Sequence, residues 1–309
     1  MKISKAVVIL SILTGLLAVI QAGAGLFWQG GTGPFSFDTL HNGSVEMYGQ
    51  GLYAFDTYFR APIFRGTDAV TLFLCVPLLV VALLLYRRGS LRGGLLLVGV
   101  LGYFLYNSAS VALGTAYNNI FLVYIAYFSA SLFAFILAFN AVDLQEVAPR
   151  LAVDRRMPHL GIAILMFVSG AALLAAWLGD IIGPLTQGGY PALESYTTEV
   201  TYAFDLGIIT PIALLTGILV LLRKQMGYRL ASVMLIVLMI VGVMVATQTL
   251  FQMQAGIELT PGQFIGKAGS FMVLALIAIW LIVGFFRSVG SVPATAKRKP
   301  TSKAQVNPR

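Results

Sequence analysis

Eight apolar stretches, each long enough to cross a lipid bilayer, divide this chain into short polar segments. A transmembrane helix needs roughly 20 apolar residues to cross a hydrocarbon core about 30 Å thick. The stretches cover residues 6–27, 68–86, 94–114, 118–140, 159–179, 202–222, 230–250 and 267–286. Only 10% of the residues are charged and the mean hydropathy is +0.87, unlike a soluble domain. We therefore expect an all-α, polytopic integral membrane protein with eight transmembrane helices in a lipid bilayer.

Lys and Arg residues gather on one side of these stretches. If the chain crosses the membrane at every stretch, 17 of its 20 basic residues fall on the side that carries both termini. The exceptions are Arg60, Arg65 and Lys267. Because Lys and Arg resist translocation, this side is expected to be the cytoplasm. The sequence thus predicts a multi-pass protein of the plasma membrane with cytoplasmic N and C termini.

The net charge of +8 follows from this orientation, so we expect no nucleic-acid partner. Residues 288–309 are rich in Ser, Pro, Lys and Ala and are predicted to form a disordered, basic cytoplasmic tail. This tail either has no partner or contacts anionic lipid. Residues 1–24 resemble a signal peptide, but their apolar run exceeds the usual length of roughly 7–15 residues. That length favours a retained first span, and cleavage stays open.

The two halves of the sequence share features in the same order. Tyr-Ala-Phe-Asp occurs at residues 53–56 and again at residues 202–205. We interpret residues 1–148 as a first four-helix repeat, with a long outer loop at 28–67, and residues 149–287 as a second repeat. Because each unit contains an even number of spans, the repeats would be parallel. A chance match between hydrophobic segments is the alternative.

The outer loop is rich in aromatic residues. Apolar residues at helical spacing (Val45, Tyr48, Leu52, Phe55 and Phe59) predict an amphipathic helix in it. Such a helix would lie in the membrane interface. It is either a lid over a cavity or part of the aromatic belt that most membrane proteins possess.

Polar side chains within the spans are the candidate ligand-binding residues, because they are costly in lipid unless they pair or meet water. The set is Asp205, Tyr202, Lys267, Gln248, Asn107, Tyr106, Tyr124 and Asp68. Asp205 lies 18 residues before Arg223, which places it ~27 Å from the cytoplasmic interface. We expect an outward-facing polar cavity between the repeats, with a Lys267–Asp205 ion pair. Alternatively, these residues are helix-end charges and tyrosines that pack between helices.

Two prolines and one cysteine complete the inventory of unusual residues in the spans. Pro77 and Pro211 lie inside spans, where each frees a carbonyl group and predicts a kink. Cys75 is the only cysteine, and the two histidines fall on opposite sides of the membrane. These residues form no metal or haem site, and the sequence contains no phosphate-binding loop or serine-hydrolase motif. We expect no metal, cofactor or catalytic residue.

The function class is a choice between three hypotheses. The first is binding or translocation of a small solute or ion, without ATP hydrolysis, through the outward-facing cavity. The second is a non-transporting membrane subunit or sensor that binds a protein or lipid partner. The third is a lipid-modifying enzyme that uses Asp56, Asp68 or Asp205, because carboxylates alone can perform acid–base chemistry.

Overall fold

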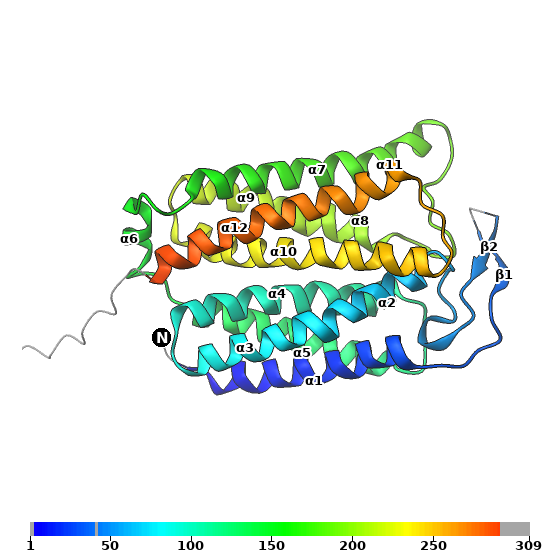
Figure 1. The fold of residues 1–309 in the computed structure, drawn as a ribbon, viewed down its shortest axis with the longest axis horizontal. Helices are drawn as coiled ribbons and strands as arrows, with labels where there is room; N and C mark the ends of the chain where they lie inside the picture. Colours follow the sequence, from blue (N-terminus) through cyan, green and yellow to red (C-terminus); the bar gives the residue numbers. More distant parts are fainter. Residues whose placement is uncertain (1–2, 41–42, 291–309) are drawn as a thin grey trace, which may run out of the picture.

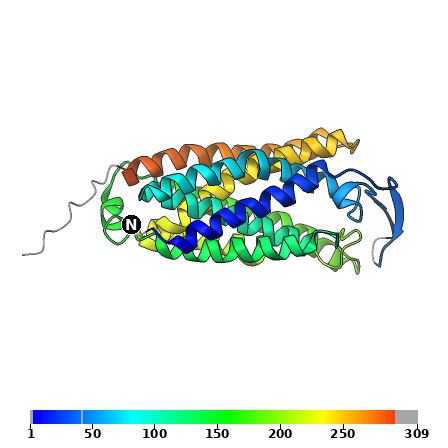
Figure 2. The ribbon, with the colours of Figure 1, turned by 90° about the horizontal axis from the view of Figure 1, so that it is seen from below.

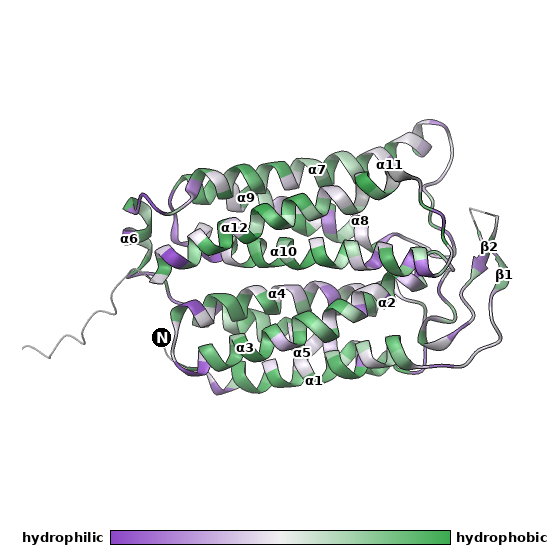
Figure 3. Cartoon of the chain, in the orientation of Figure 1, coloured by the Kyte–Doolittle hydropathy of each residue, from purple (hydrophilic) through white to green (hydrophobic). Residues whose placement is uncertain are grey.

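The computed structural model describes residues 3–40 and 43–290, except for the side chains of residues 261, 263 and 267. In this part of the chain, eight helices are long and apolar enough to cross a membrane. Hydrophobic residues cover these helices, and hydrophilic residues gather toward the two ends of the bundle (Figure 3). The prediction of a mostly helical, multi-pass membrane protein is confirmed.

The eight spans differ from the expected ranges mainly in length. Two of them contain a π-helical turn (η2 and η3), a third such turn (η4) directly precedes the last span, and η1 is a 3₁₀-helix. The helical elements are α1 (Lys5–Phe27), η1 (Gly51–Tyr53), α2 (Ala61–Val70), η2 (Thr71–Cys75), α3 (Val76–Arg87), α4 (Leu91–Gly114), α5 (Phe121–Ala141), α6 (Ala148–Val153), α7 (His159–Thr186), α8 (Val200–Phe204), η3 (Asp205–Ile209), α9 (Thr210–Leu221), α10 (Gln225–Gln254), α11 (Pro261–Phe264), η4 (Ile265–Gly269) and α12 (Ser270–Gly290).

The bundle is elongated and has two different ends (Figures 1 and 2). One end carries the start of the chain, α6 and the end of α12, and is called the terminal end. The other carries the β-hairpin and is called the hairpin end. Helices α4 and α10 run side by side through the middle of the bundle (Figure 1). Two thirds of the apolar segment of each central helix is buried, against one third in the other spans, because these two lie in the middle of the bundle.

Two helical connections at the terminal end have the same backbone geometry. After α3, the N–H of Ser90 donates to the carbonyl of Leu85, and after α9, the N–H of Lys224 donates to that of Leu219. The residue that precedes each donor has a positive φ, of 74° and 55°. Both are therefore Schellman turns, which satisfy carbonyl groups left over at a helix end. They occupy equivalent places in the two halves of the chain, directly after the second span and directly after the sixth.

The two expected proline kinks are wide π-helical turns. Pro77 and Pro211 each follow a π-turn and occupy the second position of the next α-helix. The step in residue number from Pro77 to Pro211 equals the step between the donors of the two Schellman turns. Proline lacks the N–H that would close the normal hydrogen bond four residues back, so the helix widens by one residue instead of breaking. Thr71 and Asp205 are the first residues of the two turns, and the side chains of both are buried in the bundle.

Close helix contacts occur in exchanged pairs. A Cβ on Gly66 of α2 would lie 2.6 Å from Cα of Gln248 in α10, and one on Gly114 of α4 would lie 3.6 Å from Cβ of Val200 in α8. The separation in residue number between the two prolines is also the separation between Gly66 and Val200 and between Gly114 and Gln248. Each of the two glycines therefore contacts the residue that lies this same number of residues beyond the other.

Glycines of α4 also bring the two central helices together. A Cβ on Gly99 would meet the side chain of Ile236 in α10, and one on Gly102 would meet Val233 of the same helix. Small residues let helix backbones approach closely inside a membrane, where apolar burial between helices adds little. The contact between α4 and α10 therefore forms the centre of the bundle.

The long connection before α2 contains a β-hairpin, so the all-α expectation and the predicted amphipathic helix are wrong at this place. Strand β1 (Phe35–Asp38) pairs antiparallel with β2 (Ser44–Met47). Gly49 follows with a φ of 69°, and a Cβ there would clash with the carbonyl group of Gly33. Because this left-handed, crowded backbone suits only glycine, a helix cannot run through residues 45–59.

Two other expectations need correction. The repeated Tyr-Ala-Phe-Asp sequence adopts two structures: residues 53–56 lie in η1 and the turn after it, whereas residues 202–205 lie in α8 and the start of η3. The predicted tail begins too early, because α12 continues through Gly290. Residues 291–309 lie outside the described part of the chain.

Gly66→Ala tests the contact between α2 and α10. We expect it to lower the free energy of unfolding by about 1–3 kcal/mol, because the added methyl group meets backbone atoms of Gln248 that cannot move aside. Thermal unfolding of the purified protein in detergent measures the change. The matched control is Gly179→Ala in α7, where an added Cβ meets no atom within 4 Å. Equal stability of the two variants would contradict the packing described here.

Candidate functional site

The predicted site residues form several clusters rather than one cavity. Asp205 accepts hydrogen bonds from the hydroxyl of Tyr106 in α4, at 3.0 Å, and from Nε1 of Trp177 in α7, at 2.9 Å. The ring of Tyr202 packs at a tilt against that of Trp177, with 5.1 Å between ring centroids. The structure thus brings together Asp205, Tyr106 and Tyr202. The side chain of Lys267 lies outside the described part of the chain, so its expected ion pair is not described.

The other predicted residues bond elsewhere. Asn107 donates to the hydroxyl of Tyr127 at 3.3 Å, Asn118 donates to that of Tyr124 at 2.8 Å, and Gln248 donates to Thr67 at 2.8 Å. Asp68 belongs to a separate cluster described below. Apart from Lys267, whose side chain is not described, none of the predicted residues lines either of the two cavities described below.

A cavity of about 400 Å³ opens at the hairpin end, between the end of α1, the start of α2 and the loop that joins them. Its size lies in the range of small-molecule sites. The backbone of the loop is held by its own hydrogen bonds, among them Gly33 N–H to Gly49 and Gly51 N–H to Gly30. The cavity is lined by Gly25, Leu26, Trp28, Gln29, Gly30, Gly31, Tyr48, Gln50, Gly51, Leu52, Tyr53 and Arg65.

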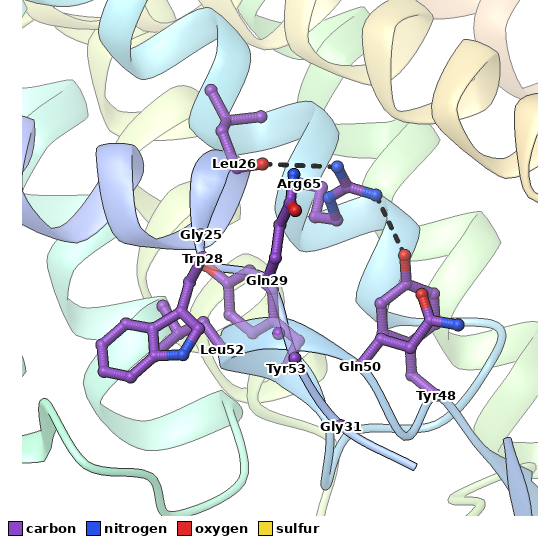
Figure 4. A pocket seen from close by; sticks show the side chains of 12 residues that line it. Gly25, Leu26, Trp28, Gln29, Gly31, Tyr48, Gln50, Leu52, Tyr53 and Arg65 are labelled. Atoms are coloured by element: carbon purple, nitrogen blue, oxygen red, sulfur yellow. Dashed lines mark hydrogen bonds between the residues drawn. The ribbon is translucent and has the colours of Figure 1, made fainter. Parts of the chain in front are cut away.

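Arg65 lies at the inner wall of this cavity. Its Nη1 donates to the hydroxyl of Tyr48 at 2.9 Å and its Nη2 to the carbonyl of Leu26 at 3.4 Å. Figure 4 shows the guanidinium group between these two oxygens, with Gln29 beside it and Trp28 on the other side of the cavity. Within the described part of the chain, Arg65 is the only charged residue of the lining.

Tyr53 joins the cavity to a buried carboxylate. Its hydroxyl donates to Oδ2 of Asp68 at 2.7 Å, and Nε2 of Gln21 donates to Oδ1 of Asp68 at 2.8 Å. Asp68 lies in α2, Gln21 in α1 and Tyr53 in η1, and each is at most 1% exposed. A carboxylate inside a membrane span is costly unless it is bonded, so this arrangement satisfies both of its oxygens.

A second network joins the loop before α2 to the loop between α7 and α8 at the hairpin end. Arg60 forms ion pairs with Glu194 and Glu199 and lies over the ring of Tyr196, 4.4 Å from its centroid. Oδ1 of the fully buried Asp56 accepts from the hydroxyl of Tyr196 at 2.7 Å and from the N–H of Ala116 at 2.8 Å. Burial raises the pKa of Asp56 to about 6, although its two hydrogen bonds and Arg60 oppose the rise.

Another cavity, of about 380 Å³, lies at the terminal end beside the corner between α6 and α7. His159 and Arg223 are among its lining residues. Nε2 of His159 lies 3.0 Å from the hydroxyl of Tyr228, and this contact holds the start of α7 against α10. None of its described lining residues donates a hydrogen bond to a buried carboxylate, as Tyr53 does in the hairpin-end cavity, so it is the weaker candidate site.

Sequence reasoning missed three of the residues that matter here. Gln21 and Trp177 donate to the buried carboxylates, and Tyr53 is singled out in the sequence only as part of the repeated Tyr-Ala-Phe-Asp and the aromatic-rich loop. A signal existed for Arg60 and Arg65, since both break the pattern of basic residues on one side of the membrane. No family model, curated protein or solved structure matches this chain.

Asp56→Asn tests the burial of this carboxylate. Because the folded-state pKa of Asp56 is raised from 3.8 to about 6, the folded state holds more protons between these pH values. The stability that Asp56 contributes is therefore present below pH 3.8 and is lost as the pH rises through 6. Asn keeps the acceptor oxygen but cannot ionise.

We expect the free energy of unfolding of Asp56→Asn, relative to the unsubstituted protein, to rise by up to about 3 kcal/mol from about pH 4 to pH 7. Thermal unfolding at a series of pH values measures it. Asp143→Asn, at an exposed position near the terminal end, is the control for a general charge effect. A pH-independent difference would show that Asp56 is not buried as described.

Proposed function

We propose that this chain binds a small polar solute in the hairpin-end cavity and that the carboxylate of Asp68 responds to the solute. The observation that carries the proposal is the hydrogen bond from Tyr53, a residue of the cavity lining, to Asp68 inside the span. An ionisable residue within a membrane span is a functional site by default, because lipid penalises it. A solute that displaces Tyr53 leaves Asp68 without one of its donors.

Translocation is the extension of this function, and Asp205 is its second charged element. The cluster of Asp205, Tyr106 and Trp177 joins α4 to η3 and α7, and so lies where the two proposed repeats meet. The π-turn at Asp205 supports this role, since such turns are frequent at functional sites. The solute would enter through the hairpin-end cavity and pass this cluster without ATP hydrolysis.

A non-transporting sensor or subunit is the second candidate. It is favoured by the hydrogen bonds among the polar side chains of the spans, such as Asn107 with Tyr127 and Gln248 with Thr67. Polar side chains that hydrogen-bond to each other leave fewer donors and acceptors for a solute than side chains that line a water-filled path. Solute binding without uptake into vesicles would favour this candidate.

The orientation and the duplication are also proposals. The terminal end carries most of the basic residues, which supports a cytoplasmic location for it in the cell membrane, with the cavity outside. The exchanged contacts, the paired prolines and the two Schellman turns all share one step in residue number, which supports two parallel repeats, at 1–148 and 149–287.

One cysteine substitution tests both the site and its side of the membrane. Cys75 is the only natural cysteine and is buried, so Gln50→Cys introduces a single reactive thiol at the cavity. We expect a membrane-impermeant maleimide to label Gln50→Cys in intact cells. Val153→Cys, exposed at the terminal end, should be labelled only after the membrane is opened.

The label then fills the cavity. With purified protein, we expect one or more members of a panel of acetate, benzoate, glucose and betaine to raise the melting temperature, and labelling of Gln50→Cys to abolish this rise. Phe55→Cys, exposed at the same end but outside the cavity lining, is the control and should keep the response. Responses that survive labelling at residue 50 would contradict binding in this cavity, and labelling at residue 153 in intact cells would reverse the orientation.

A further inference from the structure

The charge of the hairpin-end cavity points to the class of solute, and this inference rests on the proposed function. We propose that the cavity binds a small organic anion whose carboxylate or phosphate group is held by the guanidinium group of Arg65. The described lining contains this one cation, neutral polar side chains on Gln29, Gln50, Tyr48 and Tyr53, and no carboxylate. Its net charge is therefore positive.

Arg65 differs from its neighbour Arg60 in its partners. Arg60 forms ion pairs with Glu194 and Glu199, which neutralise it. Among the described residues, Arg65 has no carboxylate oxygen within 4 Å and donates to two neutral oxygens, those of Tyr48 and Leu26. A guanidinium group has five N–H donors, of which these two oxygens use two, and the ring centroid of Phe251 lies 5.8 Å from Cζ of Arg65.

Among the described residues, Asp68 forms no ion pair with Arg65. It lies three residues further along α2, and its two oxygens accept from Tyr53 and Gln21 instead. It is fully buried behind Tyr53, outside the lining of the cavity. An incoming anion therefore meets Arg65 first.

The remaining walls fit an organic anion. Trp28 is 46% exposed, so its indole ring offers an apolar face on the side of the cavity opposite Arg65 (Figure 4). A planar guanidinium group matches the two oxygens of a carboxylate or phosphate and forms charge-assisted hydrogen bonds with them. A ring or short chain beside the anionic group would then lie against Trp28.

Binding of benzoate and of benzyl alcohol to the purified protein tests this inference. The two probes share a ring and differ in charge. Fluorescence of Trp28 and the melting temperature are the readouts, with Trp28→Phe to identify the fluorescence signal. We expect benzoate to bind and benzyl alcohol to bind at least about 10-fold more weakly, because hydrogen bonds to a charged group are the stronger ones.

Arg65→Gln should weaken benzoate binding at least about 10-fold, and Arg65→Lys should retain part of it. Arg88→Gln removes the same charge from the terminal end and should bind benzoate normally. If Arg65→Gln unfolds, the comparison of the two probes and Arg65→Lys still decide the outcome. Unchanged benzoate affinity in Arg65→Gln would limit Arg65 to a structural role and overturn the inference.

Two further comparisons separate the possible outcomes. Binding of phenyl phosphate, and binding of benzoate in nanodiscs with or without phosphatidylglycerol, distinguish a soluble anion from a lipid headgroup. If benzoate bound only in nanodiscs that contain phosphatidylglycerol and competed with this lipid, the soluble-anion assignment would be overturned. Equal binding of benzyl alcohol and benzoate, both lost after labelling of Gln50→Cys, would preserve solute binding but overturn the anion class. No response to any probe would count against both proposals.

Discussion

The hydrogen bond between Tyr53 and Asp68 is the contact on which the hairpin end of this protein depends. Asp68 is a carboxylate within a membrane span, where an unbonded ionisable group is costly. Its donors are Gln21 from α1 and Tyr53 from the loop outside the span. The loop is therefore held against the bundle, and the space left between the loop and the ends of α1 and α2 is the cavity that contains Arg65.

Helices α2–α4 and α8–α10 share several contacts, whereas the loops before α2 and α8 differ, and the candidate site lies at the first of these loops. The exchanged glycine contacts and paired proline π-turns relate α2–α4 to α8–α10. The first half has the hairpin loop at residues 28–60, whereas the second has a shorter connection at residues 187–199. Arg60 and Asp56 bind the two loops together. The helices thus hold the ends of both loops, and the longer loop lines the candidate site together with α1 and α2.

Hydropathy alone predicted all eight spans, because roughly 20 apolar residues have few other uses in a protein. The expected cavity grouped Asp205 and Tyr106 with six other residues, and in the structure these two share a hydrogen bond. Neither hydropathy nor polar spacing could predict that Asp68 bonds to Tyr53, since that partner lies in a loop whose path depends on left-handed glycines such as Gly49. The same glycines explain why the helical spacing of apolar residues at 45–59 wrongly predicted an amphipathic helix. The two Tyr-Ala-Phe-Asp sequences adopt different structures because four residues are too few to determine a local fold.

A double-mutant cycle on solute affinity tests the central claim most directly. Benzoate affinity would be measured for the unsubstituted protein, Tyr53→Phe, Asp68→Asn and the double variant. If the cavity communicates with Asp68 through the Tyr53 hydroxyl, the double variant should match Asp68→Asn, with a coupling free energy of about 0.5–3 kcal/mol. Independent, additive effects of the two substitutions, or no effect of either, would contradict the account.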